Sequence, residues 1–317
     1  MPLFPRKQNH YLSKCSAYGT TVKIFHNTIV CLKERRLPYR FKNAIKSFRN
    51  LVKYGSSDMF KHIFIDTITA CNRRCYYCPN SSSERGLMKN MSRMDAKLYQ
   101  KIIDQLAAMG WDGEVAPNFY GEPLIDDRMA DLVKYTRNKL PSSKILLYTN
   151  GDFLTLDLYI SLISAGVNAF IVTCHPDVTP RFVEDILDYR RNESNDEVEF
   201  IYQKLSGITN RGGLVDVEQE CHRKVCDEAT MKVGVQWDGN IILCCNDYFV
   251  TTQLGNVNTE NLFSIWNKSE YKQLRRDLRI GVFKLEICKN CKYGIIPMLD
   301  TASLLPAAKT ISEAISS

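Results

Sequence analysis

The sequence predicts an α/β protein whose main domain is a partial (β/α) barrel, followed by a small cysteine-rich domain that contains a β-hairpin. Between residues 62 and 204, short apolar runs alternate with segments of helical periodicity, and several of these runs are almost continuously apolar. Such runs are typical of parallel strands buried on both faces, so the alternation indicates a TIM-type barrel of β/α units. After residue 212 the alternation stops, and six of the twelve cysteines follow.

The elements of the barrel can be placed in order along the chain. The predicted strands occupy residues 62–69, 114–119, 144–150, 168–174 and 198–204. The predicted helices between them occupy residues 94–109, 127–139, 154–165 and 180–191. The chemistry of such a barrel is expected at the C-terminal ends of its strands. Beyond the barrel, Asp238-Gly239 is a turn dipeptide between two strand-like runs, which predicts a hairpin over 233–245.

An N-terminal extension carries the excess positive charge of the chain. Residues 1–54 contain twelve Lys or Arg and one acidic residue, Glu34, whereas the rest contains 30 basic and 34 acidic residues. Apolar residues recur at helical spacing over 37–55, and a hairpin is expected at 20–32. The helix either packs its apolar stripe on the main domain, which is the commoner arrangement, or binds a membrane or an anionic partner.

These patterns give the expected domain organisation. The domains are a basic extension with an amphipathic helix at 1–58, the barrel at 59–212, the cysteine-rich domain at 213–295 and a tail at 296–317. The N-terminus lacks the apolar run of a secretory signal, and no run of eighteen apolar residues predicts a membrane span. We therefore expect a cytoplasmic location, where cysteines bind metals or do redox chemistry more often than they form disulfides.

The first cysteine group follows the first predicted strand. Cys71, Cys75 and Cys78 have the spacing C-x3-C-x2-C, and no further cysteine lies between residues 54 and 94. Tetrahedral zinc and closed iron–sulfur clusters normally have four protein ligands. This segment provides three, and an open coordination position on a metal is a position for a substrate or a cofactor.

This spacing, with Tyr77 in the aromatic position before the third cysteine, resembles the radical S-adenosylmethionine (radical SAM) superfamily. The resemblance continues in 120-YGEP-123 at the end of the second strand and in 149-TNG-151 after the third. The glycine–glutamate motif of the family often begins with a further glycine, where this chain has Tyr120. Each short motif alone is weak, but their order at successive strand ends makes the resemblance specific over about residues 60–210.

The resemblance implies an enzyme in which Cys71, Cys75 and Cys78 hold a 4Fe–4S cluster, whose fourth iron binds S-adenosyl-L-methionine (SAM). One electron from the cluster cleaves SAM to a 5′-deoxyadenosyl radical, which abstracts hydrogen from the substrate. The cofactor carries this chemistry, and the protein positions and shields it. The implied SAM-contacting residues are Tyr77 near the adenine, Gly121, Glu122 and Pro123 near the amino group, and Thr149 and Asn150 near the ribose.

The second cysteine group comprises Cys221, Cys226, Cys244, Cys245, Cys288 and Cys291. Four thiolates would also suit zinc, and ligand type alone does not separate zinc from an iron–sulfur cluster. The order of the cysteines resembles the SPASM and twitch extensions of radical SAM enzymes, and none follows Cys291. The resemblance therefore implies one auxiliary 4Fe–4S cluster, held by Cys226, Cys244, Cys288 and Cys291. Cys245 is an alternative to Cys244, and an unused cysteine would be a small buried hydrophobe.

The spacing of the second group resembles sugar and aminocyclitol dehydrogenases and epimerases, which implies dehydrogenation or epimerisation of a sugar, aminocyclitol or nucleoside-type substrate. An epimerase returns a hydrogen atom, usually from a cysteine thiol, and Cys174 at the end of the strand 168–174 is the candidate donor. A buried structural thiol is the alternative interpretation of Cys174, and dehydrogenation is then favoured. Arg211, in the glycine-rich turn 206–214, either binds a phosphate or carboxylate or belongs to a plain surface loop.

The expected partners are a sugar-like small molecule or a peptide, and a reducing protein such as flavodoxin or ferredoxin that the basic extension would attract. Modification of a ribosomally made peptide is the alternative function within the superfamily. A zinc-stabilised nucleic-acid-binding protein is the alternative outside it. The near-neutral charge of the chain beyond residue 54 argues against nucleic-acid binding.

Overall fold

The structure, a computed structural model, describes residues 39–174, 182–192, 197–204 and 208–295. The chain divides into two compact units, Met1–Asp58 and Met59–Ser317. In the first unit, α2 (Tyr39–Tyr54) forms where a helix was predicted, and its binding partner stays a prediction. The expected hairpin at 20–32 and the tail at 296–317 lie outside the described residues. No helix in the described ranges has the length and apolar character of a membrane span.

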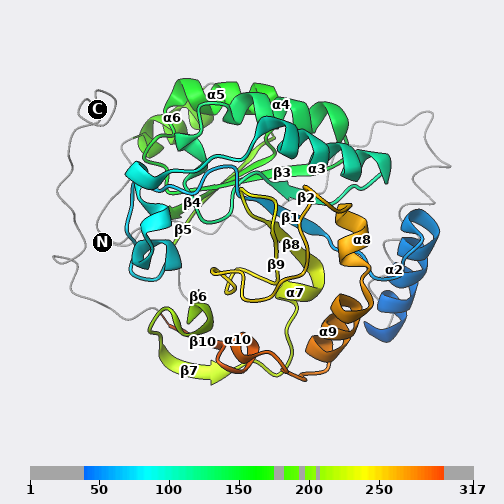
Figure 1. Cartoon of the computed structure of the whole chain (residues 1–317). Helices are drawn as coiled ribbons and strands as arrows, with labels where there is room; N and C mark the ends of the chain where they lie inside the picture. The colour runs from blue at the N-terminus through cyan, green and yellow to red at the C-terminus, as the bar shows by residue number, and fades with distance from the viewer. Residues whose placement is uncertain (1–38, 175–181, 193–196, 205–207, 296–317) are drawn as a thin grey trace, which may run out of the picture. The chain divides into compact units, whose positions relative to one another are not determined.

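A seven-stranded sheet forms the centre of the second unit (Figure 1), in the order β5-β4-β3-β2-β1-β8-β9. Its strands are β1 (His62–Ile65), β2 (Glu114–Ala116), β3 (Lys144–Thr149), β4 (Ala169–Cys174), β5 (Glu199–Lys204), β8 (Lys232–Val235) and β9 (Ile241–Ile242). All neighbouring pairs are parallel except β8 and β9. The predicted partial (β/α) barrel is therefore confirmed.

The helices that connect these strands are α3 (Ala96–Ala108), α4 (Met129–Lys139), α5 (Leu156–Ala165) and α6 (Val183–Asn192). Asp95 caps α3 by accepting a hydrogen bond from Lys97 N–H at 2.6 Å, and Thr155 caps α5 in the same way. α5 ends at Gly166, whose φ of 115° only glycine adopts readily. Figure 1 shows α3 to α6 as a row along the outer side of the parallel strands.

The main hydrophobic core lies between this row of helices and the sheet. Leu147 and Phe170 from neighbouring strands pack there with Val133 of α4, Leu162 of α5 and Ile186 of α6, all fully buried. Burial of several large apolar side chains, each contributing about 1.5–3 kcal/mol, holds the helices on the strands. The C-terminal ends of the strands lie outside this core and carry polar loops.

The predicted strands 62–69 and 114–119 were too long. β1 ends at Ile65 and β2 at Ala116, because the residues that follow leave the sheet to form loops at its C-terminal edge. Thr69 shows this change, since its N–H donates to the carbonyl of Ser92 at 3.0 Å instead of to a neighbouring strand. Several of these residues, among them Asp66, Thr67 and Asn118, are buried in loops and not in the sheet.

The hairpin expected in a separate cysteine-rich domain is instead part of the barrel sheet. β8 pairs in parallel with β1, with Ile63 opposite Val233 and Ile65 opposite Val235. Val233 and Val235 are fully buried, as in a central strand covered on both faces. The C-terminal ends of β1 and β8 therefore lie side by side, and the loop after β8 reaches the same edge as the first cysteine group.

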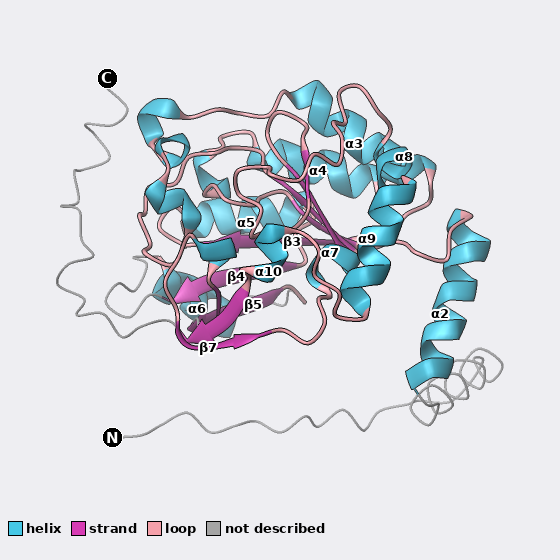
Figure 2. Ribbon diagram, turned by 60° about the horizontal axis from the view of Figure 1, so that its bottom comes forward, coloured by secondary structure: helices cyan, strands magenta, loops and turns pink. Residues whose placement is uncertain are grey.

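The C-terminal segment also contains a three-stranded sheet in the order β6-β10-β7 and several short helices. Its elements are β6 (Ile208–Thr209), β7 (Glu218–His222), α7 (Glu228–Met231), α8 (Leu262–Trp266), α9 (Ser269–Arg279), α10 (Glu286–Lys289) and β10 (Lys292–Ile295). Figure 2 shows α8 beside α3. The N–H of Leu262 in α8 donates to the side-chain oxygen of Gln105 in α3 at 2.8 Å.

Candidate active site

The first cysteine group lies on an irregular loop directly after β1. The N–H of Cys71 donates to the carbonyl of Gly86 at 3.1 Å, and the N–H of Cys78 donates to that of Cys75 at 2.9 Å. Cys78 then precedes the 3-10 helix η1 (Pro79–Ser82). The loop folds back on itself, so that three partly buried thiols lie close enough to influence one another electrostatically.

Burial raises the pKa of Cys71 to about 12 and that of Cys75 to about 11, and it raises the pKa of Cys78 as well. The carboxyl group of Glu122 and the other two cysteines raise the pKa of Cys71 further. Without a bound cation these thiols would stay neutral at pH 7. Coordination to a metal deprotonates a thiol outright, so the loop fits a cationic cluster held by three thiolates.

Glu122 joins the YGEP and TNG motifs from a buried position. Its carboxylate accepts hydrogen bonds from the Thr149 hydroxyl at 2.6 Å, from Asn150 N–H at 2.9 Å and from Leu124 N–H at 3.2 Å. Burial raises the pKa of Glu122 to about 7, although these donors favour its charged form. The side chain of Asn150 then donates to the Asn72 side chain at 2.8 Å. Three predicted SAM-contacting residues are thus brought together beside the cysteine loop.

Gly121 lies where no side chain fits. A Cβ there would lie 2.0 Å from the carbonyl oxygen of Ile68, so the backbone of the motif approaches the cysteine loop closely. Pro123 follows as the first residue of η4 (Pro123–Ile125). Tyr120 replaces the usual first glycine, and its hydroxyl donates to the carbonyl of Cys245 at 3.4 Å. The departure from the family motif therefore adds a contact to the second cysteine group.

Asp152 is a site residue that the sequence reasoning missed. Its carboxylate accepts hydrogen bonds from Asn72 Nδ2 and Arg73 Nε, each at 2.7 Å, and it pairs with Arg73 Nη2 as well. The signal was present, because Asp152 directly follows TNG and Asn72-Arg73 lie inside the cysteine spacing. The bidentate ion pair fixes the cysteine loop to the loop after β3.

Two predicted site residues have less defined surroundings. Tyr77 packs against Ile208, Val215 and Val217, and its expected place near the adenine stays a prediction. Cys174 is the last residue of β4, but its side chain lies outside the described part of the structure. Its role as a hydrogen donor also stays a prediction.

The predicted auxiliary ligands line one cavity in the C-terminal segment, which they reach from separate places in the chain. They are Cys226, Cys244, Cys288 and Cys291. The lining also includes the apolar residues Leu243, Leu278, Phe283 and Ile287. Cys245 and Cys221 are not part of the described lining, and Cys221 is exposed on β7.

Burial raises the pKa of Cys244 well above its usual range and that of Cys288 to about 12, and neighbouring cysteines add to both shifts. The thiols of Cys244 and Cys288 therefore also require a cation to ionise. Within the described residues, no three His, Cys, Asp or Glu side chains meet closely enough to hold a single metal ion. A 4Fe–4S cluster takes one thiolate on each iron, so its ligands surround the cluster instead of meeting at one point.

Arg211 lies in the loop between β6 and β7 with its Nε atom buried. Burial lowers its pKa, but nearby Cys245, Cys78, Tyr120 and Cys244 outweigh this effect and raise it. Arg211 therefore lies within electrostatic range of both cysteine groups. Arg211 also has a φ of 50°, which is uncommon for a residue with a side chain.

Comparison with known proteins agrees with this arrangement. A model of the radical SAM superfamily matches residues 65–207, and a model of the SPASM iron–sulfur cluster-binding domain matches residues 226–292. A curated relative, S-adenosyl-L-methionine-dependent 2-deoxy-scyllo-inosamine dehydrogenase of Niallia circulans, is 30% identical over 236 residues, which are 74% of this chain and 93% of that enzyme. The chain belongs to the radical SAM superfamily.

Two solved structures of BtrN resemble this radical SAM enzyme. One, in complex with AdoMet and 2-DOIA, has a TM-score of 0.65 and 29% identity, and covers 74% of this chain and 93% of its own. The other, an open conformation, has a TM-score of 0.58 and 27% identity, and covers 74% and 92%. The predicted radical SAM and SPASM-type resemblance is confirmed, and the cofactors are 4Fe–4S clusters and SAM.

Proposed function

We propose that this radical SAM enzyme oxidises a secondary alcohol of an aminocyclitol to a ketone, with 2-deoxy-scyllo-inosamine or a close analogue as substrate. The relative from Niallia circulans is named for the dehydrogenation of this compound, and the chain covers 93% of that enzyme. The observation that carries the proposal is this similarity, and the family models match the segments of both cysteine groups, residues 65–207 and 226–292. The alternatives of nucleic-acid binding and peptide modification have no comparable support.

The reaction needs a place for hydrogen and a place for an electron. When bound, SAM and the clusters supply acceptors for one hydrogen atom and one electron of the alcohol, and the hydroxyl proton leaves to solvent. Cys71, Cys75 and Cys78 would hold one cluster, and the loops joined by Glu122 would hold SAM. Arg211, which lies within electrostatic range of both cysteine groups and whose buried Nε has no hydrogen-bond partner among the described residues, is suited to bind an oxygen of the substrate, because a guanidinium forms strong charge-assisted hydrogen bonds.

Anaerobic reconstitution followed by incubation with SAM, dithionite and 2-deoxy-scyllo-inosamine tests the proposal. We expect a product two mass units lighter than the substrate, together with 5′-deoxyadenosine in equal amount. Deuterium at the oxidised carbon of the substrate should appear in the 5′-deoxyadenosine. Cleavage of SAM without incorporation of deuterium from this or any related aminocyclitol would reject the proposed substrate class.

Epimerisation would need the thiol of Cys174 to return a hydrogen atom. Cys174→Ala in heavy water separates the two reactions. Under the proposed dehydrogenation, the variant turns over and gives the same ketone without solvent deuterium on carbon. Loss of product together with solvent deuterium in the wild-type product would favour an epimerase.

We also propose a reducing protein of the flavodoxin or ferredoxin type as partner, and a cytoplasmic location. The twelve basic residues among residues 1–54 would attract an acidic electron carrier. Added potassium chloride should therefore slow turnover driven by reduced flavodoxin while leaving turnover driven by dithionite largely unchanged. Equal salt dependence with both reductants would argue against electrostatic docking.

A further inference from the structure

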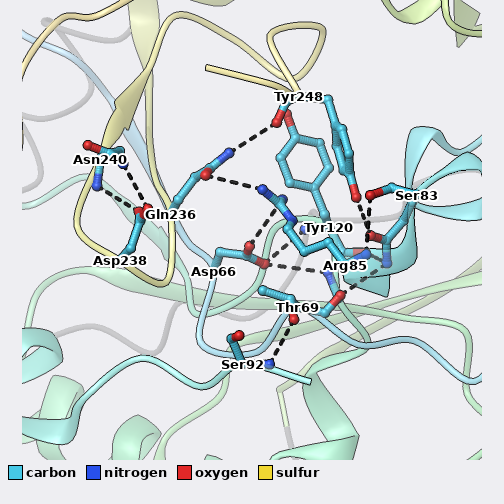
Figure 3. A network of polar contacts seen from close by, with 12 residues as sticks. Asp66, Thr69, Ser83, Arg85, Ser92, Tyr120, Gln236, Asp238, Asn240 and Tyr248 are labelled. Carbon is cyan, nitrogen blue, oxygen red and sulfur yellow. Dashed lines mark hydrogen bonds and ion pairs between the residues drawn. The ribbon is translucent and has the colours of Figure 1, made fainter. Parts of the chain in front are cut away.

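A buried polar contact centred on Arg85 joins two segments of the chain (Figure 3). One is the SAM-cluster loop, residues 66–95 between β1 and α3, and the other is the auxiliary segment, residues 226–291. Arg85 lies in η2 (Glu84–Gly86), on the loop that carries the cysteines. Its Nη1 donates to the side-chain oxygen of Gln236 at 3.2 Å, and its Nη2 lies 3.8 Å from Oδ2 of Asp66. The guanidinium carbon lies 4.4 Å from the ring centroid of Tyr248 and 5.4 Å from that of Tyr120.

The partners of Arg85 come from three separate parts of the chain. Asp66 follows β1 and Gln236 follows β8, and these strands are parallel neighbours that end at the same edge. Tyr248 lies three residues after Cys245, in the auxiliary segment. Its hydroxyl donates to Oδ1 of Asn80 at 2.8 Å, and Asn80 lies two residues after Cys78. The same two segments are therefore connected twice.

The contact is buried and has a specific geometry. Asp66 is 0% exposed, Tyr248 1% and Gln236 2%. Among the described residues, Oδ2 of Asp66 and both Nε and Nη2 of Arg85 have no hydrogen-bond partner, although such buried groups are normally satisfied. An apolar contact would hold the segments together at lower desolvation cost, so the buried pair contributes orientation more than stability.

Cation–π contacts add to this orientation. The guanidinium carbon of Arg85 lies over two aromatic rings, and the strength of such a contact depends on the position of the ring. Tyr120 also precedes Gly121, and the Gly121 and Tyr120 N–H groups both donate to Oδ1 of Asp66, at 3.4 and 3.2 Å. A shift of Arg85 would therefore move the loop that approaches the cysteines as well.

We propose that Arg85 is a positioning residue that keeps the SAM-cluster loop and the auxiliary segment in register, so that SAM cleavage stays coupled to substrate oxidation. This inference rests on the proposed dehydrogenation, in which hydrogen leaves the substrate at one site and an electron leaves at the other. A misplacement of about 1 Å between such sites costs on the order of 100-fold in rate. Arg85 touches none of the described cysteine side chains, and it acts through Gln236, Tyr248 and Asp66.

The ratio of 5′-deoxyadenosine to ketone measures coupling directly. In Arg85→Ala we expect this ratio to rise by about tenfold, because SAM is cleaved without productive oxidation. Arg85→Lys keeps a charge opposite Asp66 but lacks the planar fork, so its ratio should fall between those of Arg85→Ala and wild type. Arg93→Ala is the matched control. Arg93 lies on the same loop as Arg85, but it forms an exposed ion pair with Asp127, which follows η4. A wild-type ratio in Arg85→Ala would overturn the proposal.

Hydrogen exchange of the full-length protein gives a readout that does not depend on the substrate. Peptides from residues 79–90 and 236–250 should exchange faster together in Arg85→Ala and not in Arg93→Ala. If wild type cleaves SAM but oxidises no aminocyclitol, the proposed function fails while paired exchange still supports the positioning role. Unchanged exchange in Arg85→Ala would reject that role even if the dehydrogenase activity is established.

A second variant decides the question if Arg85→Ala does not fold. Tyr248→Phe keeps the ring beside Arg85 and removes only the hydrogen bond to Asn80. We expect the 5′-deoxyadenosine to ketone ratio of this variant to rise by about threefold while its iron content stays at the wild-type level. A wild-type ratio in both Tyr248→Phe and Arg85→Lys would overturn the proposal.

Discussion

The two cysteine sites of this enzyme are built in different ways. The three cysteines of the SAM-cluster site lie within residues 71–78, on one loop after β1. The four cysteines that line the auxiliary cavity come from residues 226–291 and from separate loops and the short helix α10. Local spacing is therefore enough to specify the first site, whereas the second forms only when distant segments fold together.

The two cysteine groups differ in the side chains around them as well as in their number of cysteines. The SAM-cluster loop is held by polar strand-end residues, among them Asn150, which donates to Cys71 Sγ at 3.8 Å, and Asp152. The auxiliary cavity is lined by apolar residues such as Leu278 and Phe283 together with four cysteines. An incomplete ligand set suits a site that binds a cofactor, and a complete set suits one that only transfers electrons.

The strongest test of this difference removes the first site. In Cys71→Ala/Cys75→Ala/Cys78→Ala, 5′-deoxyadenosine formation from SAM under dithionite should fall to background, because the cluster that would supply the electron for cleavage is lost. Iron after anaerobic reconstitution should fall from about eight to about four atoms per chain. Chromatography of the nucleoside products and iron analysis measure both effects. Continued 5′-deoxyadenosine formation would refute the assignment of the SAM-binding cluster.

Removal of the second site should separate cleavage from oxidation. Cys288→Ala/Cys291→Ala should also retain about four iron atoms, but it should still cleave SAM and give little or no ketone. The physical reason is that the electron of the substrate then lacks an acceptor. Iron analysis, 5′-deoxyadenosine and ketone are measured together. An unchanged iron content would show that these cysteines hold no cluster.

A smaller effect distinguishes the adjacent cysteines of the second site. Cys244→Ala should lower the iron content toward about four atoms, and Cys245→Ala should leave it near eight, because Cys244 lines the cavity and Cys245 does not. The two single variants are natural controls for each other. The opposite result would assign the ligand to Cys245 and place the cluster on the other side of the loop after β9.

The smallest predicted effect concerns Asp66, between the two sites. Burial raises the pKa of Asp66 to about 6. The positive charge of Arg85 lowers this pKa, and the negative charge of Asp238 raises it. A carboxyl group whose pKa is raised on folding stabilises the fold below its unfolded pKa, and this stability is lost as pH rises through 6. The contribution should fall by about 1 kcal/mol between pH 5 and 8.

Asp66→Asn tests this linkage, because asparagine resembles the protonated acid and does not titrate. Chemical unfolding of the full-length protein from pH 5 to 8 should show a smaller loss of unfolding free energy in Asp66→Asn than in wild type. Other titrating groups, including Glu122, affect both proteins equally. Parallel pH profiles for the two proteins would contradict the raised pKa of Asp66.

Much of the fold was predictable because each strand and helix carries its own pattern. The parallel strands are apolar runs, and the helices between them begin at capping residues such as Asp95 and Thr155. The expected strand ends were less accurate, since Asp66 and Thr67 are buried without continuing β1. A residue after β1 can be buried in a loop as well as in a strand, and only pairing with the neighbouring strand distinguishes the two.

The site was predictable where its residues follow one another closely. C-x3-C-x2-C, YGEP and TNG are short motifs, and the structure places Glu122 and Asn150 against the cysteine loop. Asp152 and Arg85 were missed because their hydrogen-bond partners lie far away in sequence and could not be predicted from local spacing. The position of β8 beside β1 was also missed, since a hairpin signal does not reveal which sheet the hairpin joins.

By itself, the sequence determined the radical SAM identity, the three-cysteine site and the order of strands and helices, because spacing and periodicity are local properties of the chain. Only the tertiary structure decided that Cys244 lines the auxiliary cavity, that Arg211 lies within electrostatic range of both cysteine groups and that Arg85 connects Asp66 to Gln236. These features depend on contacts between residues far apart in sequence. Their geometry is set by the parallel pairing of β1 with β8, which brings the loop of the first cysteine group and the loop after β8 to one edge of the sheet.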